Sequence, residues 1–310
     1  PRDLFLTVGG FDTRYRPAYY EDADLAFAIR AAGREVYYQP AARIIHFEGV
    51  SSGTDTRSGI KKHQALNQAK FEAKWATTLK GHGIDASLQH VARDRYARSR
   101  ILVIDACALT PDADSGSLRM FNLLQMLAQQ GAKVTFAAEN LQSYEPYSTQ
   151  LRLAGIEHLS VPHIFNLTQY LESHGYEFDV IVLSRKHIAQ QFIDTVRRVA
   201  PESRIVFDTV DLMFLRLERQ AAHENSTALE ADAAKCKEVE LSLCAKSDIV
   251  FVVSPVEAEL LAPHIPREKI ALVSNIHRLY PSKVSFDDRH GIMFVGGYQH
   301  PPNVDAVDFF

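Results

Sequence analysis

The chain has 310 residues, a formal net charge of -4 and 46% hydrophobic residues, the composition of an ordinary globular protein of about two domains. So small a net charge, without a sustained run of Lys or Arg, argues against a nucleic-acid partner. No apolar run approaches the roughly 20 residues that span a bilayer, so we expect membrane contact to be peripheral at most. The three cysteines form no Cys-x-x-Cys pair, which suits a reducing compartment and favours a cytoplasmic protein.

The first part of the chain, residues 1–80, predicts helices joined by short extended segments. Asp22 can cap a helix that ends at Gly33, because apolar residues between them recur at helical spacing. Two short strands are expected next, and a second helical pattern follows them. The expected strands cover 34–38 and 42–46, and the second helix covers 61–80. A segment of about 50 residues cannot bury a core alone, so we expect its beginning to pack against other parts of the protein.

Three carboxylates, Glu21, Asp22 and Asp24, stand where the first expected helix begins. Carboxylates at the mouth of a helix can bind cations, and one of them can accept a proton while its neighbours hold it in position. The alternative is a structural role, in which Asp22 caps the helix and the other two complement its dipole. Spacing alone leaves both interpretations open.

The order of motifs in this part resembles the C-terminal part of family 2 glycosyltransferases, which have the GT-A fold. The motifs are Gly9-Gly10-Phe11-Asp12, Tyr20-Glu21-Asp22-Ala23-Asp24-Leu25, Tyr37-Tyr38-Gln39-Pro40 and His46-Phe47-Glu48-Gly49. The resemblance implies that Asp22 is the general base toward the acceptor hydroxyl, with Glu21 and Asp24 supporting it. It also implies that His46 is a ligand of a divalent Mg²⁺ or Mn²⁺ ion that holds the donor diphosphate. The nucleotide-binding half of such a module would precede Pro1, so residues 1–80 are not expected to catalyse alone.

A polar, Arg-rich segment, 81–99, is expected to be a linker, and a different pattern begins after it. Short β-branched runs alternate with amphipathic segments over 100–287. Continuous apolar runs such as Val180-Ile181-Val182-Leu183 are typical of strands buried on both faces, and intervening helices imply parallel crossovers. The expected strands are 101–104, 133–137, 157–161, 179–183, 204–207, 248–253 and 269–273. The sequence therefore predicts an α/β fold with a doubly wound, Rossmann-like parallel sheet.

Helix ends support this pattern. Gly131 and Gly155 stand where helix C-caps are expected, and Ser254-Pro255 offers an N-cap followed by proline at the first helical position. After the last expected strand, residues 288–310 begin with another apolar strand pattern and continue through a Pro-Pro turn into a helix. A further α/β domain is therefore expected to start there.

A second candidate site follows the first expected strand of this region. A loop containing Ser115 and Gly116 opens onto a helix, where backbone N–H groups can receive a phosphate or a sugar hydroxyl. It is neither a Gly-x-Gly-x-x-Gly nor a Walker loop, which argues against a dinucleotide-binding protein or an NTPase. A plain strand-to-helix connection is the alternative. Asp208 and Asp211 follow a later strand, where helix capping and acceptor binding are equally compatible with the pattern.

Residues 100–310 resemble family 4 glycosyltransferases of the GT-B fold. The matching motifs are Thr110-Pro111-Asp112-Ala113-Asp114-Ser115-Gly116-Ser117, Phe207-Asp208-Thr209-Val210-Asp211-Leu212, Glu257-Ala258-Glu259-Leu260, Phe294-Val295-Gly296-Gly297 and His300-Pro301-Pro302-Asn303-Val304-Asp305-Ala306. The resemblance implies that 100–287 is the acceptor-side domain, with Ser115 and Gly116 on the cleft floor, and that 288–310 begins the donor-binding domain. Its implied ligand contacts are Asp208 and Asp211 for the acceptor, and Gly296, Gly297 and Asn303 for the donor phosphates. No cofactor is expected for this module beyond its nucleotide-sugar substrate.

Together the two resemblances predict a fragment of a bacterial two-module glycosyltransferase of the hexosyltransferase type. They imply inversion in the first module and retention in the second. The expected partners are a nucleotide-sugar donor and a glycan or lipid-linked glycan acceptor of a cell-surface polysaccharide such as an O-antigen or capsule. A peripheral position at the inner face of the cytoplasmic membrane would suit such an acceptor. The chain begins without a methionine and ends inside an expected helix, so we expect a piece of a longer protein that is inactive by itself. The alternatives are a sugar-nucleotide epimerase on a GT-B scaffold and a catalytically silent docking module for a glycan or partner.

Overall fold

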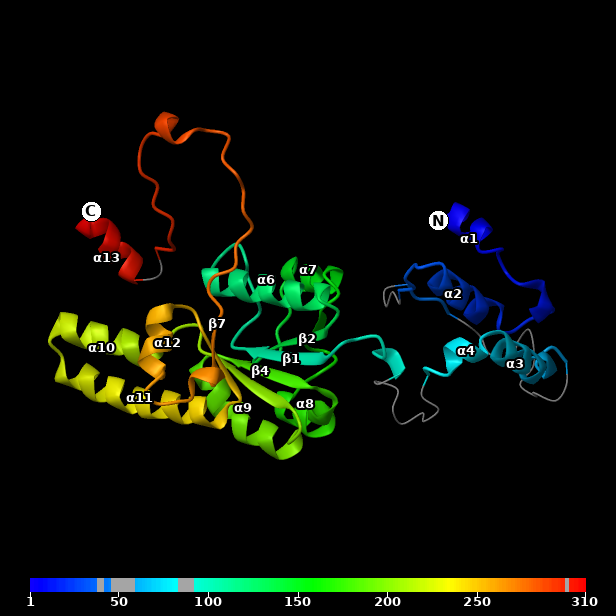
Figure 1. Ribbon diagram of the computed structural model, residues 1–310, viewed down its shortest axis with the longest axis horizontal. Coiled ribbons are helices and arrows are strands. Elements are labelled where there is room, and N and C mark those ends of the chain that lie inside the picture. The colour runs from blue at the N-terminus through cyan, green and yellow to red at the C-terminus, as the bar shows by residue number, and fades with distance from the viewer. Residues whose placement is uncertain (38–41, 46–58, 83–91, 299–300) are drawn as a thin grey trace. The chain divides into compact units, whose positions relative to one another are not determined.

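The computed structural model describes residues 1–37, 42–45, 59–82, 92–298 and 301–310. They form two compact units, Pro1–Arg95 and Tyr96–Phe310 (Figure 1). The boundary between them falls inside the segment 81–99, and the finer division of the chain into domains stays a prediction.

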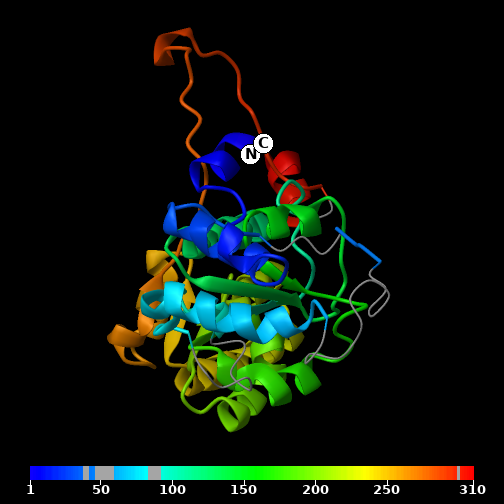
Figure 2. The ribbon, with the colours of Figure 1, turned by 90° about the vertical axis from the view of Figure 1, so that its right-hand side faces the viewer.

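The first unit consists of short helices. They are α1 (Arg2–Thr7), the 3-10 turn η1 (Thr13–Tyr15), α2 (Glu21–Ala31), α3 (Lys62–Lys74) and α4 (Ala76–Leu79). α2 and α3 lie side by side (Figures 1 and 2), because the ring of Phe27 in α2 packs on Phe71 of α3 at 5.0 Å and on Trp75 at 5.4 Å. Aromatic pairs at such distances contribute beyond the area that they bury. The two helices are thereby fixed to each other by a small aromatic core.

The strands expected over 34–38 and 42–46 do not form in the residues of these segments that the structure describes, 34–37 and 42–45. Tyr37 is 80% exposed and Ile44 is 91% exposed. A strand is stabilised by the ladder and side-chain pairs that it makes with a neighbouring strand. The described residues of this unit supply no such neighbour, so the β-branched pattern alone was misleading.

The second unit is built on a sheet of seven parallel strands. They are β1 (Arg100–Asp105), β2 (Lys133–Ala138), β3 (Glu157–Leu159), β4 (Val180–Ser184), β5 (Arg204–Asp208), β6 (Ile249–Val252) and β7 (Ile270–Leu272). Their order is β3-β2-β1-β4-β5-β6-β7. Each strand coincides with one that the sequence predicted, and every pairing is parallel. The Rossmann-like, doubly wound α/β fold is therefore confirmed.

Helices cover both faces of this sheet (Figure 1). They are α6 (Ser115–Gln129), α7 (Tyr147–Leu153), α8 (Leu167–His174), η3 (Gly175–Glu177), α9 (Lys186–Val199), α10 (Met213–Glu224), α11 (Thr227–Lys246), α12 (Pro255–Leu261) and η4 (Arg267–Lys269). Side chains of β1 alternate between two cores: Val103 packs with α6 and α7, whereas Leu102 and Ile104 pack with α8 to α12. Because successive strand residues point to opposite faces, this two-sided burial requires the continuous apolar runs seen in the sequence.

The chain leaves the sheet after β7 and runs through η5 (Phe286–Asp288) to α13 (Pro301–Phe309). The helix expected after the Pro-Pro turn is therefore present. The strand expected near residues 292–295 is not formed, and Met293 and Val295 are more than four-fifths exposed (84% and 81%). These residues have no neighbouring strand among the described residues, which explains why their apolar pattern does not produce one. That a further domain begins at 288 stays a prediction.

A buried ion pair joins three elements of the second unit. Arg119 of α6 is 2% exposed and donates two hydrogen bonds, of 2.8 and 3.0 Å, to the two carboxylate oxygens of Asp208, which is 0% exposed at the end of β5. The same guanidinium donates to the carbonyl oxygen of Val273, directly after β7, at 2.9 and 3.0 Å. A buried charge is tolerated only when it is paired and hydrogen-bonded. This pair therefore joins α6 to the carboxyl ends of β5 and β7.

We predict that Arg119→Met destabilises the second unit by about 3–5 kcal/mol, because the substitution leaves the buried Asp208 carboxylate unpaired. Far-UV circular dichroism during denaturant unfolding reports mainly on this larger unit. Fluorescence of Trp75, the single tryptophan of the chain, reports on the first unit and serves as the internal control. The double variant Arg119→Met/Asp208→Leu should recover most of the loss. A loss below about 1 kcal/mol, the size typical of exposed pairs, would contradict this account.

Candidate functional site

The sheet of the second unit has its topological switch point between β1 and β4. α6 follows β1 on one face, and α9 follows β4 on the other. In open parallel sheets, ligands bind in the crevice outside the carboxyl ends of strands at such a point. Asp105 ends β1 there, Arg185 follows β4, and the first turn of α6 holds Ser115 and Gly116. This is the candidate site of the second unit.

Arg185 and Asp105 form an ion pair at the switch point. The Nε atom of Arg185 lies 2.8 Å from Oδ1 of Asp105, which is 1% exposed. The backbone of Arg185 has a positive φ of 79°, and its N–H donates to the carbonyl oxygen of Asp208 at 2.8 Å. Burial raises the pKa of Asp105, although Arg185 opposes this effect. A left-handed backbone at a non-glycine residue is strained, and such strain is found mostly at functional sites.

Gly116 lies directly beside this arginine. A Cβ atom added to Gly116 would stand 3.2 Å from Nη2 of Arg185 and 3.3 Å from Oδ1 of Asp114. Asp114 is the N-cap of α6 and accepts a hydrogen bond of 2.8 Å from the N–H of Ser117. Partial burial raises the pKa of Asp114, but the bonds from Ser117 outweigh it and lower the pKa below its usual value. The absence of a side chain at Gly116 thus leaves space for the guanidinium at the α6 N-terminus.

Asp208 and Asp211, the two carboxylates expected on the acceptor side, each have a charged partner within the unit. Both carboxylate oxygens of Asp208 accept from the buried Arg119, so this contact joins β5 to α6, and a role of Asp208 in acceptor binding stays a prediction. Asp211 is about half exposed (48% of its side chain) and pairs with Arg216 at 3.2 Å. In the C-terminal segment, Nδ2 of Asn303 donates to the carbonyl oxygen of Gly297 at 2.9 Å. A Cβ on Gly296 would come within 2.9 Å of Asn303, so the structure brings the three expected donor-side residues together.

In the first unit, Glu21 and Asp22 border an open pocket of about 320 Å³. The segment before α2 supplies the rest of its lining, which comprises Phe11, Asp12, Thr13, Tyr15, Arg16 and Pro17. Asp22 is exposed in the first turn of α2, and its Oδ1 accepts from the N–H of Ala23 at 2.7 Å. The N-cap of α2 is Tyr20, which makes no side-chain cap, so Asp22 does not cap the helix as one interpretation of the sequence held. Its carboxylate instead lies at the mouth of the pocket.

Asp24, expected to support catalysis, is a buried anchor behind this pocket. It is 2% exposed, and it accepts from the Tyr15 hydroxyl at 3.0 Å, from Nε1 of Trp75 at 2.7 Å and from Nζ of Lys74 at 2.8 Å. Burial raises the pKa of Tyr15, and so does its bond to Asp24. Burial lowers the pKa of Lys74, but its bonds to Asp24 and Asp12 raise it overall. Asp24 therefore joins α2 to α3 and has no open side toward a substrate.

Several of these residues were missed by the sequence analysis. Asn67, Lys74 and Trp75 all lie in the expected helix 61–80, and their spacing along one helix face is the signal that would have found them. Arg185 follows the apolar run of β4 by one residue, so its position at a strand end was visible in the sequence. Their partners were not visible, because each lies 48 or more residues away.

The metal-ligand role that the resemblance gives to His46 falls outside the residues that the structure describes. Within the described ranges, no three His, Cys, Asp or Glu side chains come together as ligands of a cation. The described residues alone therefore do not form a metal site. The divalent ion stays a prediction from the resemblance.

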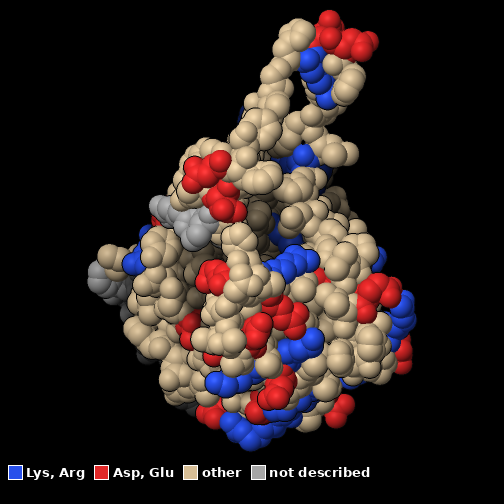
Figure 3. Space-filling model, turned by 90° about the vertical axis from the view of Figure 1, so that its left-hand side faces the viewer, with Lys and Arg blue, Asp and Glu red and all other residues tan. Residues whose placement is uncertain are grey.

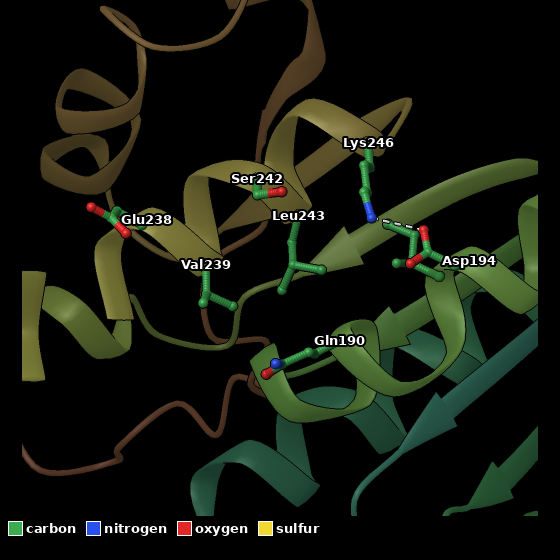
Figure 4. Close-up of a pocket in the computed structure, with 8 residues that line it drawn as sticks. Gln190, Asp194, Glu238, Val239, Ser242, Leu243 and Lys246 are labelled. Atoms are coloured by element: carbon green, nitrogen blue, oxygen red, sulfur yellow. Dashed lines mark hydrogen bonds and ion pairs between the residues drawn. The ribbon is translucent and has the colours of Figure 1, made fainter. Parts of the chain in front are cut away.

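The second unit has two further pockets among its described residues. One, of about 300 Å³, lies between α9 and α11, where Lys246 and Asp194 point toward each other at 2.7 Å (Figure 4). The other, of about 740 Å³, is lined by α6, α7 and the chain after β7. Both are open to solvent and mixed in polarity. On the face shown in Figure 3, acidic and basic side chains are interspersed, which agrees with the small net charge.

Comparison with known proteins finds short regions of similarity. No family model matches the chain. Over 75 residues, 23% of this chain and 17% of the relative, it is 37% identical to a galactofuranosyl glycosyltransferase of Leishmania donovani. Over 62 residues it is 40% identical to the N-acetylglucosaminyl-diphospho-decaprenol L-rhamnosyltransferase of two Mycobacterium tuberculosis strains, covering 20% of each chain. The chain thus spans a fifth or less of the length of these curated relatives, which are glycosyltransferases.

Among solved structures, a putative UDP-N-acetylglucosamine 2-epimerase from Listeria monocytogenes superposes with a TM-score of 0.33 at 14% identity. The superposition covers 56% of this chain and 44% of that one. A similarity this loose adds nothing to the sheet order described above. Separately, no helix among the described residues is both long and apolar enough to cross a membrane.

We predict that Asp12→Asn makes the first unit less sensitive to acid. Partial burial raises the pKa of Asp12, but the N–H of Arg14 and the ammonium of Lys74 lower it from 3.8 to about 2. A depressed carboxyl pKa stabilises the fold above the unfolded-state pKa, and this contribution is lost as the pH falls from about 4 to about 2. Asparagine does not titrate, so the variant should lose less stability over that interval, by on the order of 1–2 kcal/mol after allowance for solvent screening.

Urea unfolding followed by Trp75 fluorescence at several acid pH values measures this difference. Asp3→Asn, which removes an exposed carboxylate of the same unit, is the matched control and should leave the pH dependence unchanged. Equal pH dependence in wild type and Asp12→Asn would show that the pKa of Asp12 is not depressed.

Proposed function

We propose that this chain is part of a glycosyltransferase that uses nucleotide-activated sugars to extend or modify a cell-surface polysaccharide of the O-antigen or capsule type. The observation that carries the proposal is the pocket of the first unit, which is lined by the exposed Asp22 and the half-buried Glu21, while Asp24 is fixed by protein partners. The curated relatives, which are glycosyltransferases, support the class of reaction. Glycan or lipid-linked glycan acceptors and a cytoplasmic site at the membrane face are parts of the same proposal.

In the first module, Asp22 is the general base. The acceptor hydroxyl attacks the anomeric carbon of the donor, its proton passes to the Asp22 carboxylate, and the diphosphate leaves with the electron pair of the glycosidic bond. A positioned base of this kind contributes about 10²–10⁴-fold to the rate. Glu21 lies beside Asp22 at the same pocket, and the buried Asp24 holds the first turn of α2. If a Mg²⁺ or Mn²⁺ ion is bound near His46, it supplies charge stabilisation for the departing diphosphate.

In the second module, the crevice at the switch point is the proposed acceptor side. Ser115 and Gly116 offer the first N–H groups of α6, and Arg185 adds a partly exposed guanidinium beside them. Hydroxyl groups of a sugar are bound by such donors, and Asp211, about half exposed after β5, can accept from them. The grouped Gly296, Gly297 and Asn303 are proposed to contact donor phosphates, because glycines allow close approach of the backbone.

Two other functions are distinguished from sugar transfer by one assay. The complete protein that carries this sequence is supplied with a panel of nucleotide sugars, with and without lipid-linked glycan. A transferase releases nucleotide and incorporates sugar only when acceptor is present. Turnover of the sugar nucleotide to its epimer without acceptor would support the epimerase alternative. Glycan binding without any turnover would support a docking module.

We predict that Asp22→Asn in the complete protein lowers kcat for transfer by the first module about 10²–10⁴-fold, with the donor KM nearly unchanged, because only the proton acceptor is removed. Incorporation of labelled sugar into lipid-linked glycan measures the effect. Asp3→Asn, an exposed acidic residue of the same unit, is the matched control and should keep wild-type activity. A kcat of Asp22→Asn within threefold of the wild-type kcat would overturn the assignment of the base.

We also predict that Gly116→Val weakens acceptor binding by the second module. Its side chain would press on Arg185 and Asp114, which stand 3.2 and 3.3 Å from the position of the Cβ. The acceptor KM should rise about tenfold, roughly the effect of losing one good hydrogen bond to a charged group. Gln129→Val, on the exposed far end of the same helix, controls for the cost of a β-branched residue in α6. An unchanged acceptor KM in Gly116→Val would place the acceptor elsewhere.

A further inference from the structure

The segment that leads into α2 has an unusual backbone. Tyr19 and Tyr20 both have positive φ angles, of 76° and 75°, and Tyr20 is the residue directly before Glu21 and Asp22. Non-glycine residues avoid the left-handed region because the Cβ atom approaches the carbonyl oxygen. Two such residues in succession persist only where the surrounding structure holds them. The direction in which α2 begins, and with it the position of Asp22, therefore depends on what fixes this segment.

Asn67 of α3 fixes it. Its side chain is 0% exposed, and Nδ2 donates to the carbonyl oxygens of Tyr15, Ala18 and Tyr19 at 2.7, 2.8 and 3.3 Å. One amide group thereby binds three carbonyls of a segment 48–52 residues earlier in the chain. A buried polar group with its partners in place is rigid, and leaving those carbonyls without a donor is costly.

Lys70, one helical turn further along α3, completes the arrangement. Its ammonium lies 2.9 Å from Oδ1 of Asn67 and 2.8 Å from the carbonyl oxygen of Arg14. The bond to Oδ1 orients the amide of Asn67 so that its NH₂ group faces the three carbonyls. Phe71, on the same face, packs against the ring of Tyr20 at 5.3 Å. α3 thus binds the backbone of the segment before α2. The pocket is lined by this segment together with Glu21 and Asp22 of α2.

We propose that Asn67, oriented by Lys70, is a positioning residue for Asp22: it holds the strained entry into α2 so that the carboxylate stands at the pocket in the geometry that proton transfer needs. Asn67 touches neither substrate nor base and acts only through the backbone of residues 15–20. The inference rests on the proposed function, in which Asp22 is the base. Misplacing a catalytic group by about 1 Å can reduce a rate by about 10²-fold, so loss of the Asn67 hydrogen bonds should be visible in kcat.

Asn67→Asp in the complete protein is the sharpest test, because aspartate has the same shape but its carboxylate cannot donate to three carbonyls. We expect kcat for transfer to fall at least about tenfold with the donor KM nearly unchanged. Hydrogen exchange measured by mass spectrometry should accelerate in peptides that cover residues 12–24. Gln68→Ala, which changes the exposed neighbour on α3, is the matched control and should alter neither readout.

The double variant Asp22→Asn/Asn67→Asp separates positioning from general support of the fold. If Asn67 acts through Asp22, the double variant should be no slower than Asp22→Asn alone, because groups that act as a unit are not additive. A further tenfold loss in the double variant, or wild-type kcat in Asn67→Asp, would overturn the inference. Should Asp22→Asn itself remain active, the assignment of Asp22 as the base fails, and the positioning role with it, while hydrogen exchange still shows whether Asn67 holds the segment.

If Asn67→Asp folds poorly, as judged by Trp75 fluorescence, Lys70→Met tests the same arrangement of Asn67, Lys70 and the carbonyl groups that they bind. Its ammonium no longer orients the amide, so we expect a smaller loss of kcat, about threefold to tenfold, and faster exchange in the same peptides. If Lys70→Met keeps both the wild-type kcat and the wild-type rate of hydrogen exchange, the proposed positioning role of Asn67 and Lys70 is contradicted.

Discussion

A buried carboxylate must be paired with a cation or with several hydrogen-bond donors, and three such pairs determine the candidate sites of this protein. Asp24 is bound by Lys74 and Trp75, Asp208 by Arg119, and Asp105 by Arg185. In each case the cation comes from a different element of the chain than the carboxylate. Because an unpaired buried charge is far more costly than an exposed pair is stabilising, these contacts fix which elements meet. These buried pairs therefore also determine where the solvent-exposed groups at the pockets lie, such as the carboxylate of Asp22.

The sequence predicted the sheet well because each of its strands is marked by residues that are adjacent in the chain. A parallel strand covered on both faces needs an uninterrupted apolar run, and the seven runs in residues 100–287 became the seven strands. Helix ends were predicted for the same reason: Gly131 and Gly155 adopt positive φ angles, and Ser254 forms a capping box with Glu257. The strands expected near 34–45 and 292–295 had similar composition but no neighbour to pair with among the described residues. Pairing is a property of two segments and was not visible in one.

The candidate site was predictable only in part, again for a physical reason. Glu21, Asp22 and Asp24 were found as a group because they are adjacent in sequence, but their different roles depend on contacts about 50 residues away. Asp24 faces α3 and is buried, whereas Asp22, two residues earlier, faces solvent. On a helix, residues two apart point in clearly different directions, so one acidic motif yields both a structural anchor and an open carboxylate. Both oxygens of Asp208 likewise accept from Arg119, a residue 89 positions earlier in the chain, and a contact over that separation is not visible in the sequence.

The polar face of α3 explains how so small a unit can hold a strained segment. Asn67, Lys70 and Lys74 recur at three- and four-residue spacing, as the apolar face of a core helix does, but they bind carbonyl and carboxylate oxygens of the segment before α2 and of α2 itself. An apolar face would have buried more surface yet left the carbonyls of the strained backbone without donors, each a cost comparable to a lost hydrogen bond. Directional bonds also fix the angle at which the segment enters α2, which non-directional apolar contacts do not. A Glu-Asp motif is therefore only half of this site: the other half is a donor-bearing helix face that reaches it from elsewhere in the chain.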